Sequence, residues 1–317
     1  MESSTSSPSD PPRVAIFAPH PLLTVAIESR GEQDDVHTHV GGQGIWVARM
    51  AGELGAWPIV CSFAGGETGD VIEHLLAELP GELRLTRTAG TSGSYVVDRR
   101  SGERRLVAHQ VAPPPSRHEL DDLFSATTAA ALEAEVLVVC NPYPGDLLPL
   151  EVFANLVSDA RGNGTRVLVD LSTPRLDHAL EGAPDLVKIN DWELAEYVYG
   201  PVSEPAEMRA AAQRLRDAGA GTVVITRAGD PAFVLDGDRE FDLVPPKFDR
   251  GAREGCGDSM MGGVAAGLAQ GMEMTDALVL GAAAGAANFL RHGLGSGSAD
   301  VVHDLVRSVE LRARVAS

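Results

Sequence analysis

Short apolar runs alternate with longer amphipathic segments over most of this chain. The apolar runs have the length and composition of buried strands and cover residues 14–18, 57–63, 136–140, 166–171, 186–189 and 222–226. The segments between them favour helices, notably over residues 45–54, 148–161, 192–199 and 205–218. This regular alternation predicts an α/β fold with a mostly parallel sheet and helices on both faces. Ligands of such sheets bind where the strands end, at their carboxyl ends.

Two segments have a different pattern, that of exposed strands. Residues 22–39 alternate polar and apolar side chains with several charges, and residues 91–110 resemble a hairpin with a charged turn at 99–103. We therefore expect one folded domain over residues 13–311, with a small β-sheet lid built from about 22–40 and 91–110. Residues 1–12 are rich in Ser and Pro and are predicted to form a disordered tail.

The segment Glu254-Gly255-Cys256-Gly257-Asp258-Ser259 leads into an uncharged run of small residues at 260–269. This run predicts a buried, closely packed helix. A glycine turn that leads into a helix N-terminus is an anion-binding arrangement, because free N–H groups and the helix dipole point to one place. Asp258 is then either an ordinary helix cap, which is the commoner role of Asp at this position, or a catalytic base.

Two further motifs each allow a structural and a functional interpretation. Asn190 and Glu193 have the spacing of a capping box, and their oxygens would also suit a hydrated Mg²⁺ beside a polyphosphate. The segment Gly41-Gly42-Gln43-Gly44 is either a tight turn before a core helix or a close contact to a small ligand. It lacks the preceding buried strand and the third glycine of a dinucleotide-binding turn. His37 and His39 have no partners at metal-ligand spacing and are interpreted as exposed strand residues.

Composition narrows the classes of partner. The chain has 317 residues, 44% hydrophobic composition and a formal net charge of −19, which argues against nucleic acid or an anionic membrane as partner. Its three cysteines have no paired motif, which suits a reducing compartment. The longest uncharged apolar run, 277–290, is too short to span a bilayer. With no signal-peptide pattern at the start, we expect a cytoplasmic protein.

Taken in order, these motifs resemble the PfkB, or ribokinase-like, family of carbohydrate kinases, with the closest likeness to the 1-phosphofructokinase and tagatose-6-phosphate kinase branch. The Gly41–Gly44 loop running into a helix resembles the first family signature, and Asn190 to Glu193 matches its Asn-x-x-Glu motif. Gly255-Cys256-Gly257-Asp258 stands where the family has Gly-Ala-Gly-Asp. The likeness covers residues 14 to about 305 and implies a ribokinase-like three-layer α/β/α domain with a small β-sheet lid.

The resemblance implies an ATP- and Mg²⁺-dependent kinase that phosphorylates a hydroxyl of a sugar, sugar phosphate or polyol. Asp258 would be the general base, and the amides of Gly255, Cys256 and Gly257 would hold the charge of the transferred phosphoryl group. Asn190 and Glu193 would act through Mg²⁺. The nucleotide would contact Asn190, Thr226, Arg227, Gly229 and Gly257, and the acceptor would contact Thr24, Gly41, Gly42, Gln43, Trp46 and Asn141.

The acceptor side departs from the family pattern. Thr24 replaces an Asp, Gln43 and Trp46 replace the usual Lys and Asn, and residues 91–94 lack a phosphate-binding Arg. The nucleotide loop has Asp230-Pro231 where small residues ending in glycine are usual. We therefore expect neither fructose-6-phosphate nor fructose-1-phosphate to be a good substrate.

These departures keep two alternatives open. The chain is compatible with a kinase-fold metabolite-binding protein of weak activity, or with a ribokinase-like kinase for a nucleoside or vitamin whose flat ring stacks on Trp46. A Trp46 that only fills the core is slightly favoured over stacking. Exposed lid edges make a homodimer through the lid plausible. Cys256, at a helix N-terminus, is expected to have a lowered pKa and raised reactivity, although a simple filler role is favoured for it.

Overall fold

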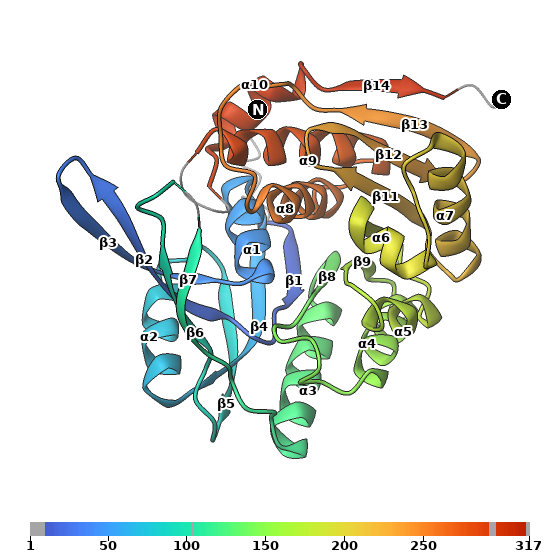
Figure 1. Ribbon diagram of the computed structural model, residues 1–317. Coiled ribbons are helices and arrows are strands. Elements are labelled where there is room, and N and C mark those ends of the chain that lie inside the picture. The colour runs from blue at the N-terminus through green and yellow to red at the C-terminus, as the bar shows by residue number, and fades with distance from the viewer. Residues whose placement is uncertain (1–9, 103, 292–295, 315–317) are drawn as a thin grey trace, which may run out of the picture.

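Two β-sheets organise the described part of the chain, which is residues 10–102, 104–291 and 296–314 of the computed structural model (Figure 1). The main sheet has ten strands among these residues. Its spatial order is β14 (Glu310–Ala313), β13 (Arg239–Val244), β12 (Asp230–Asp236), β11 (Thr222–Arg227), β10 (Leu186–Asn190), β9 (Arg166–Asp170), β8 (Val136–Cys140), β1 (Arg13–Phe17), β4 (Trp57–Gly65) and β5 (Glu82–Thr88). The strands from β5 to β11 are parallel, and the last three pairs are antiparallel.

Helices cover both faces of the main sheet, so the fold has three α/β/α layers. One apolar core lies under α1 (Gln43–Glu53), α2 (Gly66–Leu76), α8 (Cys256–Ala269), α9 (Met274–Phe289) and α10 (Ala299–Val306). A second core lies under α3 (Arg117–Leu132), α4 (Glu151–Gly162), α5 (Arg175–Glu181), α6 (Asp191–Val198) and α7 (Pro205–Asp217). The central strands are buried on both sides, which explains why they are continuous apolar runs in the sequence.

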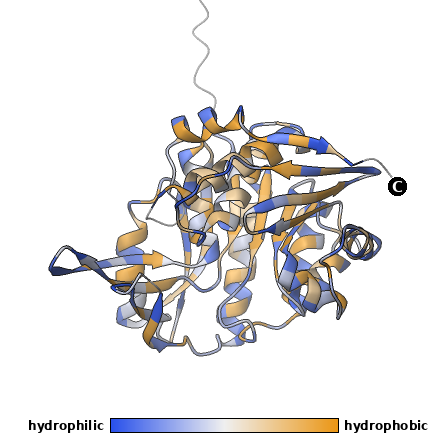
Figure 2. Ribbon diagram, turned by 45° about the horizontal axis from the view of Figure 1, so that its top comes forward, coloured by the Kyte–Doolittle hydropathy of each residue, from blue (hydrophilic) through white to orange (hydrophobic). Residues whose placement is uncertain are grey.

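The small sheet consists of β3 (Gln33–Gly41), β2 (Leu22–Arg30), β6 (Ser94–Asp98) and β7 (Arg105–Gln110), in that order. It stands beside α1, and its β2–β3 hairpin projects away from the main sheet (Figure 1). The projecting end of this hairpin is hydrophilic, whereas the central strands of the main sheet are hydrophobic (Figure 2). All six residues of β7 are exposed, so this edge of the small sheet faces solvent.

Close approach between α8 and α9 explains the small residues of both helices. A Cβ atom added to Gly263 would lie 2.8 Å from the Cα of Gly281, so a larger residue would push the two helices apart. Residues 259–269 of α8 are all buried. This confirms the closely packed helix that the sequence predicts, and it fixes the position of the turn at its N-terminus.

The structure confirms the predicted strands and corrects the start of the helix that follows Gly255. Helix α8 begins at Cys256, its N-cap is Gly255, and Asp258 is its third residue rather than its cap. The helix-cap interpretation of Asp258 is therefore wrong, because an N-cap must precede the first helical residue. The three antiparallel strands β12 to β14 at one end of the sheet, and the edge strand β5 at the other, were missed. Among the described residues, no helix is both long and apolar enough to cross a membrane.

Candidate active site

A cavity of about 680 Å³ opens at the carboxyl ends of β9, β10 and β11, next to the N-terminus of α8. Parallel strands place their following loops at one edge of the sheet, and this is where the sequence predicts a ligand. Nine predicted site residues line the cavity: Gln43, Asn190, Glu193, Thr226, Arg227, Gly229, Cys256, Gly257 and Asp258. The cavity is large enough for a nucleotide-sized ligand.

The turn before α8 depends on glycine. Gly255 has φ of 76°, in the left-handed region where a side chain is strained. At Gly257, an added Cβ atom would lie 3.1 Å from the Nζ of Lys188, so a larger residue would crowd the ammonium group. The amide of Cys256 makes only a long, 3.4 Å bond to the carbonyl oxygen of Arg253. Helix geometry leaves the first amides of α8 without intrahelical partners, and they point towards the cavity end of the helix.

Asp258 is the most perturbed acid of the site. It lines the cavity and is partly exposed there, yet protein atoms surround its carboxyl group on the other sides. Burial, reinforced by the nearby carboxylate of Asp170, raises its pKa to about 7. Lys188 and the side chain of Gln43 act in the opposite direction. A carboxyl group with a pKa near neutrality suits a general base.

Asp170 and Lys188 form a buried ion pair beside Asp258, with 2.5 Å between Oδ2 and Nζ. Both side chains are less than a tenth exposed. Burial alone would lower the pKa of Lys188, but the charges of Asp170 and Asp258 raise it above its usual value. The ammonium group therefore stays charged at the wall of the cavity, where it can attract a phosphate.

Asn190 and Glu193 form the capping box that the sequence indicates. The Oδ1 of Asn190 accepts a hydrogen bond of 2.8 Å from the Glu193 amide, and the Glu193 carboxylate accepts one of 3.2 Å from the Asn190 amide. Both residues also line the cavity, so the capping role and a ligand role are compatible. Burial, and then the charge of Asp170, raise the pKa of Glu193.

The side-chain oxygens of Asn190 and Glu193 are ligands of the kind that Mg²⁺ prefers. The cavity also leaves room for the water molecules that a bound Mg²⁺ retains. The residue types therefore fit a hydrated Mg²⁺. Among the described residues, no group of three or more His, Cys, Asp or Glu side chains could hold a metal ion by itself. His37 instead lies 3.4 Å from the carboxylate of Asp35.

Several predicted acceptor residues lie together around the first turn of α1. A Cβ atom on Gly41 would be 3.3 Å from the ring of Trp46 and 3.4 Å from the hydroxyl of Thr24. Gly42 is the N-cap of α1, with φ of 111°. Trp46 is only 6% exposed, and its ring contacts that of His39 with 5.7 Å between centroids. This burial favours the core-filling interpretation of Trp46 over ring stacking.

Asn141 has its side chain bonded to Ser172 and Arg175. Its Nδ2 donates to the Ser172 hydroxyl at 3.1 Å, and its Oδ1 accepts from the Nε of Arg175 at 2.9 Å. Its backbone amide donates to the Oε1 of Gln43 at 2.6 Å. The side-chain carbonyl of Gln43 is thus tied to the loop after β8.

Tyr95 and Arg99 join the small sheet to loops of the main domain. Tyr95 meets Tyr143, with 5.6 Å between ring centroids, and Arg99 forms an ion pair with Glu254. Burial, together with the hydrogen bond to Tyr143, raises the pKa of Tyr95. The sequence does not foretell these contacts, because each joins residues far apart in the chain.

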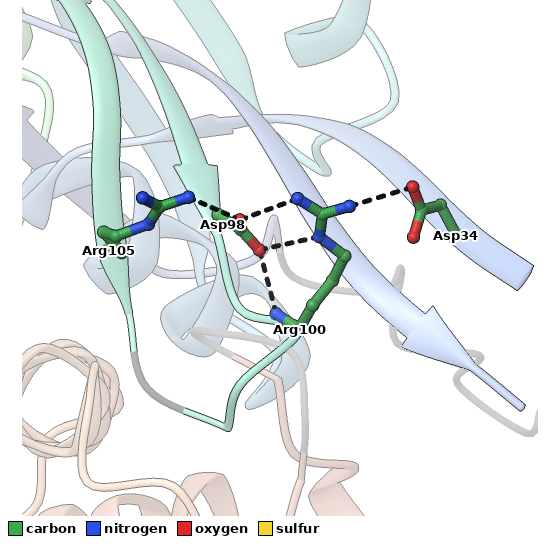
Figure 3. Close-up of polar contacts among 4 residues, drawn as sticks. All are labelled: Asp34, Asp98, Arg100 and Arg105. Atoms are coloured by element: carbon green, nitrogen blue, oxygen red, sulfur yellow. Dashed lines mark hydrogen bonds and ion pairs between the residues drawn. The ribbon is translucent and has the colours of Figure 1, made fainter. Parts of the chain in front are cut away.

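The turn that carries Arg99 is fixed by a cluster of charges (Figure 3). Asp98 accepts hydrogen bonds from the side chains of Arg100 and Arg105, each at 2.9 Å, and Arg100 also reaches Asp34 at 3.1 Å. The guanidinium of Arg100, and then that of Arg105, hold the pKa of Asp98 well below its usual range. These bonds hold the backbone directly beside Arg99.

The predicted acidity of Cys256 is wrong. Burial raises the pKa of its thiol, and the nearby carboxylate of Asp258 acts in the same direction. A hydrogen bond from Asn288 only partly offsets this. The favourable field at the helix N-terminus is outweighed by burial and by the neighbouring carboxylate.

The charged residues of the cavity wall that the sequence reasoning missed include Asp170 and Lys188. A signal was present for Lys188, because it interrupts the apolar run at 186–189, and a charged residue in a buried strand needs a partner. The identity of that partner depends on β9 and β10 being neighbours in the sheet, which the spacing along the chain does not reveal.

Comparison with known proteins agrees with this geometry. A family model described as "pfkB family carbohydrate kinase" matches residues 21–300. The ATP-dependent 6-phosphofructokinase isozyme 2 of Escherichia coli (strain K12) is 32% identical over 260 residues, which are 80% of this chain and 82% of that protein. A 1-phosphofructokinase of Haemophilus influenzae is 24% identical over 289 residues, which are 89% and 91% of the two chains.

Solved structures give the same result for the fold. The crystal structure of phosphofructokinase-2 from Escherichia coli in complex with potassium has a TM-score of 0.81 at 27% identity, covering 93% of this chain and 98% of that one. The complex of the same enzyme with fructose-6-phosphate has a TM-score of 0.80 at 28% identity and the same coverage. The predicted three-layer, ribokinase-like fold is confirmed.

Proposed function

This chain belongs to the pfkB family of carbohydrate kinases, and we propose that it transfers the γ-phosphate of ATP to a hydroxyl of a sugar, sugar phosphate or related polyol with Asp258 as the general base. As a family member it is a phosphotransferase with an alcohol group as acceptor. The observation that carries the proposed role of Asp258 is its position: a carboxyl group at the start of α8, inside the cavity, with a pKa raised to about 7 by burial.

In the proposed reaction, Asp258 takes the proton of the acceptor hydroxyl as that oxygen attacks the γ-phosphorus. The bond from phosphorus to the bridging oxygen breaks, and ADP leaves with the electron pair. Negative charge on the transferred group is stabilised by the amides of Gly255, Cys256 and Gly257 and by the N-terminal end of the α8 dipole. The ammonium group of Lys188 lies against Gly257 and adds a full positive charge to the same region.

Asn190 and Glu193 are the residues that would hold a hydrated Mg²⁺ next to the ATP phosphates. When bound, the ion neutralises phosphate charge and orients the γ-phosphate. Thr226, Arg227 and Gly229 form the adjoining wall and are proposed to lie along the nucleotide. The Arg227 side chain itself bends back to donate a 2.8 Å hydrogen bond to the Pro231 carbonyl, so its contribution is one of shape rather than phosphate charge.

The acceptor is proposed to bind between the small sheet and Asp258, near Thr24, Gly41 and Gly42. Named relatives are phosphofructokinases. Thr24 is 8% exposed and supplies a hydroxyl where a charged partner is usual, and the Gln43 side chain is engaged by other protein groups. These features favour an acceptor other than fructose-6-phosphate or fructose-1-phosphate, and both belong in any substrate screen.

An ADP-release screen over sugars, sugar phosphates, polyols, nucleosides and vitamins tests the proposal. Wild-type protein should show turnover with at least one acceptor, and Asp258→Asn should lower kcat by about a thousandfold or more. Asp121→Asn, on the exposed face of α3, is the matched control and should behave as wild type. Tight metabolite binding with no turnover would identify a binding protein instead, and turnover that survives Asp258→Asn would reject the assigned base.

A homodimer through the small sheet is proposed as the working assembly in the cytoplasm. The edge strand β7 exposes Leu106 and Val107 by 44% and 53%, and Val36 on β3 is 60% exposed. Unpaired strand edges with apolar side chains invite pairing with a second copy. Light scattering after gel filtration should give the mass of a dimer, and Val107→Lys should shift it to a monomer. A monomeric wild type at micromolar concentration would reject this assembly.

A further inference from the structure

Arg175 lies between two loops that leave the main sheet side by side. Strands β8 and β9 pair in parallel, with Cys140 opposite Asp170, so the loops that follow them begin next to each other. Arg175 is the first residue of α5, at the end of the second loop, and it is only 8% exposed. Its guanidinium group reaches the first loop, which connects β8 to α4.

Three hydrogen bonds direct the guanidinium group of Arg175 to three points of these loops. Its Nε donates to the Oδ1 of Asn141 at 2.9 Å, and its Nη1 donates to the carbonyl oxygen of Gly145 at 2.7 Å. Its Nη2 donates to the Oγ of Ser172 at 2.6 Å. A Cβ atom added to Gly145 would clash with the guanidinium group. All three acceptors are neutral, so the arrangement depends on the directions of the N–H groups rather than on charge pairing.

The bond to Nε fixes the orientation of the Asn141 side chain. A guanidinium N–H can only donate, so the atom that faces it is the amide oxygen. The backbone amide of Ser172 donates to the same oxygen at 3.3 Å, and the Nδ2 of Asn141 donates to the Oγ of Ser172 at 3.1 Å. The Asn141 side chain thus bonds to the loop after β9, whereas the sequence predicts that it contacts the acceptor.

The loop that Arg175 holds also contacts α1 and the small sheet. The backbone amide of Asn141 donates to the Oε1 of Gln43 at 2.6 Å, and Gln43 lines the cavity at the start of α1. Tyr143 lies between the two residues of this loop that Arg175 bonds, and its ring meets that of Tyr95 on β6, with 5.6 Å between centroids. One loop therefore connects Arg175 to α1 and to the small sheet.

We infer that Arg175 is a positioning residue for the acceptor side of the site: it fixes residues 141–145 and, through them, the contacts to Gln43 and Tyr95. Its relation to the acceptor rests on the proposed function, which places the acceptor between the small sheet and Asp258. A lysine at this position would keep the positive charge. Its N–H donors share a single nitrogen, however, which cannot occupy the positions of the three guanidinium nitrogens.

A double-mutant cycle tests the link to the small sheet without any substrate. Equilibrium constants of unfolding are measured by urea titration for wild type, Arg175→Lys, Tyr95→Leu and the double variant. If Arg175 holds Tyr143 against Tyr95, removal of the Tyr95 ring should cost less once the loop has moved. The combined effect should therefore fall short of the product of the two single effects by about fivefold. A role confined to the main domain predicts a simple product, because independent sites do not couple.

Arg161→Lys is the matched control for this cycle. Arg161, in the last turn of α4, also ties two segments together, through the carbonyl oxygen of Ala183 and the carboxylate of Asp185. These residues belong to neither the loop after β8 nor the small sheet. The effects of Arg161→Lys and Tyr95→Leu should therefore multiply without coupling.

Ser172→Ala replaces Arg175→Lys in the cycle if the lysine variant does not fold. It removes only the acceptor of Nη2, so it should show coupling of the same sign to Tyr95→Leu with a smaller loss of stability. Independent effects of Arg175→Lys and Tyr95→Leu would overturn the inference. Independent effects of Ser172→Ala and Tyr95→Leu would do the same where the lysine variant does not fold.

Kinetics test the acceptor side once an acceptor is known. Arg175→Lys should raise the KM for the acceptor by about tenfold and change the KM for ATP by less than about twofold. The reason is that Gln43 and the small sheet belong to the proposed acceptor side, whereas most of the proposed nucleotide contacts follow β10 and β11. Equal increases of both KM values would reject the acceptor-side role. Coupling in the unfolding cycle without turnover of any acceptor would reject the proposed function and support the link between Arg175 and the small sheet.

Discussion

The guanidinium group of Arg99 forms an ion pair with the carboxylate of Glu254, which lies 155 positions later and directly before Gly255. Arg99 belongs to the turn after β6, and its backbone amide is held by a 2.8 Å hydrogen bond to the Ile27 carbonyl. From helix α9, Asn288 donates a 2.8 Å hydrogen bond to the Glu254 carbonyl oxygen. The small sheet and helix α9 therefore both hold the residue that begins the glycine turn.

Breaking this ion pair should affect activity more than stability. The pair is partly exposed, so Arg99→Gln should change the free energy of unfolding by no more than about 1 kcal/mol. We expect kcat/KM for the acceptor to fall by roughly threefold to tenfold, because the small sheet is no longer tied to the turn at Gly255. Steady-state kinetics with urea unfolding check this, and Arg117→Gln, in an exposed pair with Asp121, is the control. Equal losses in both variants would refute it.

Asp258→Asn should make the protein more stable at pH 8 while removing its activity. The pKa of Asp258 is raised from 3.8 to about 7, so the folded state binds more protons than the unfolded state between these values. The contribution of Asp258 to the free energy of unfolding is therefore fully present below about pH 4 and is lost as the pH rises through about 7. At pH 8, Asp258→Asn should raise the free energy of unfolding by at most about 4 kcal/mol. The loss of the attraction between Asp258 and Lys188 reduces this gain.

Urea unfolding of wild type and Asp258→Asn at about pH 5 and pH 8 measures this difference. The two proteins should be closer in stability at the lower pH. A variant that is less stable than wild type at the higher pH would show that Asp258 is charged at little cost in the folded protein.

Removing the buried cation should have the opposite effect on stability. Lys188→Met leaves Asp170 and Asp258 without their positive partner, which should destabilise the fold by about 3–5 kcal/mol. Because Lys188 lowers the pKa of Asp258, the acidic limb of the rate profile should also move to higher pH. Lys247→Met, at an exposed position of the same cavity, serves as control for stability. Similar stability of both variants would contradict the role of the ion pair.

Local signals made half of the site predictable. Asn190, Glu193 and Asp258 stand in short motifs, and the strands that precede the site are apolar runs whose ends can be seen in the sequence. The cavity brings together residues from these motifs because parallel strands end at one edge. The family resemblance then distinguished a kinase from an ordinary capped helix.

Long-range pairing made the other half unpredictable. The Asp170–Lys188 ion pair depends on strand order, and the Gln43 contacts depend on how α1 lies against the loop after β8. Strands β12 and β13 were missed because Asp230-Pro231 is typical of a loop, although here it opens β12, an antiparallel strand paired with both β11 and β13. The direction of the Cys256 pKa shift was mispredicted for a similar reason. A helix N-terminus can be recognised in a sequence, whereas the burial of a side chain cannot.

Gly255, the N-cap of α8, should be needed for activity as well as for stability. Gly255→Ala places a side chain at φ of 76° and should cost about 1 kcal/mol of stability. Gly271→Ala is the matched control, with φ of 84° and open space around its added Cβ atom. Both variants should lose similar stability, but only Gly255→Ala should lower kcat, by about tenfold or more, because it shifts the amides before Asp258. Equal kcat values would argue against the proposed anion site.

Cys256 should react slowly with alkylating reagents in the folded protein. Burial and the Asp258 carboxylate raise its pKa, so the reactive thiolate is scarcer than in an unfolded peptide. With iodoacetamide at about pH 8, we expect a rate roughly tenfold below that of the peptide, increasing to the peptide value in urea. Cys256→Ser assigns the signal, since Cys61 and Cys140 are fully buried. Because Cys256 lines the cavity, ATP should slow the reaction further. A rate at or above that of the peptide would contradict the raised pKa and support the lowered pKa expected from the sequence.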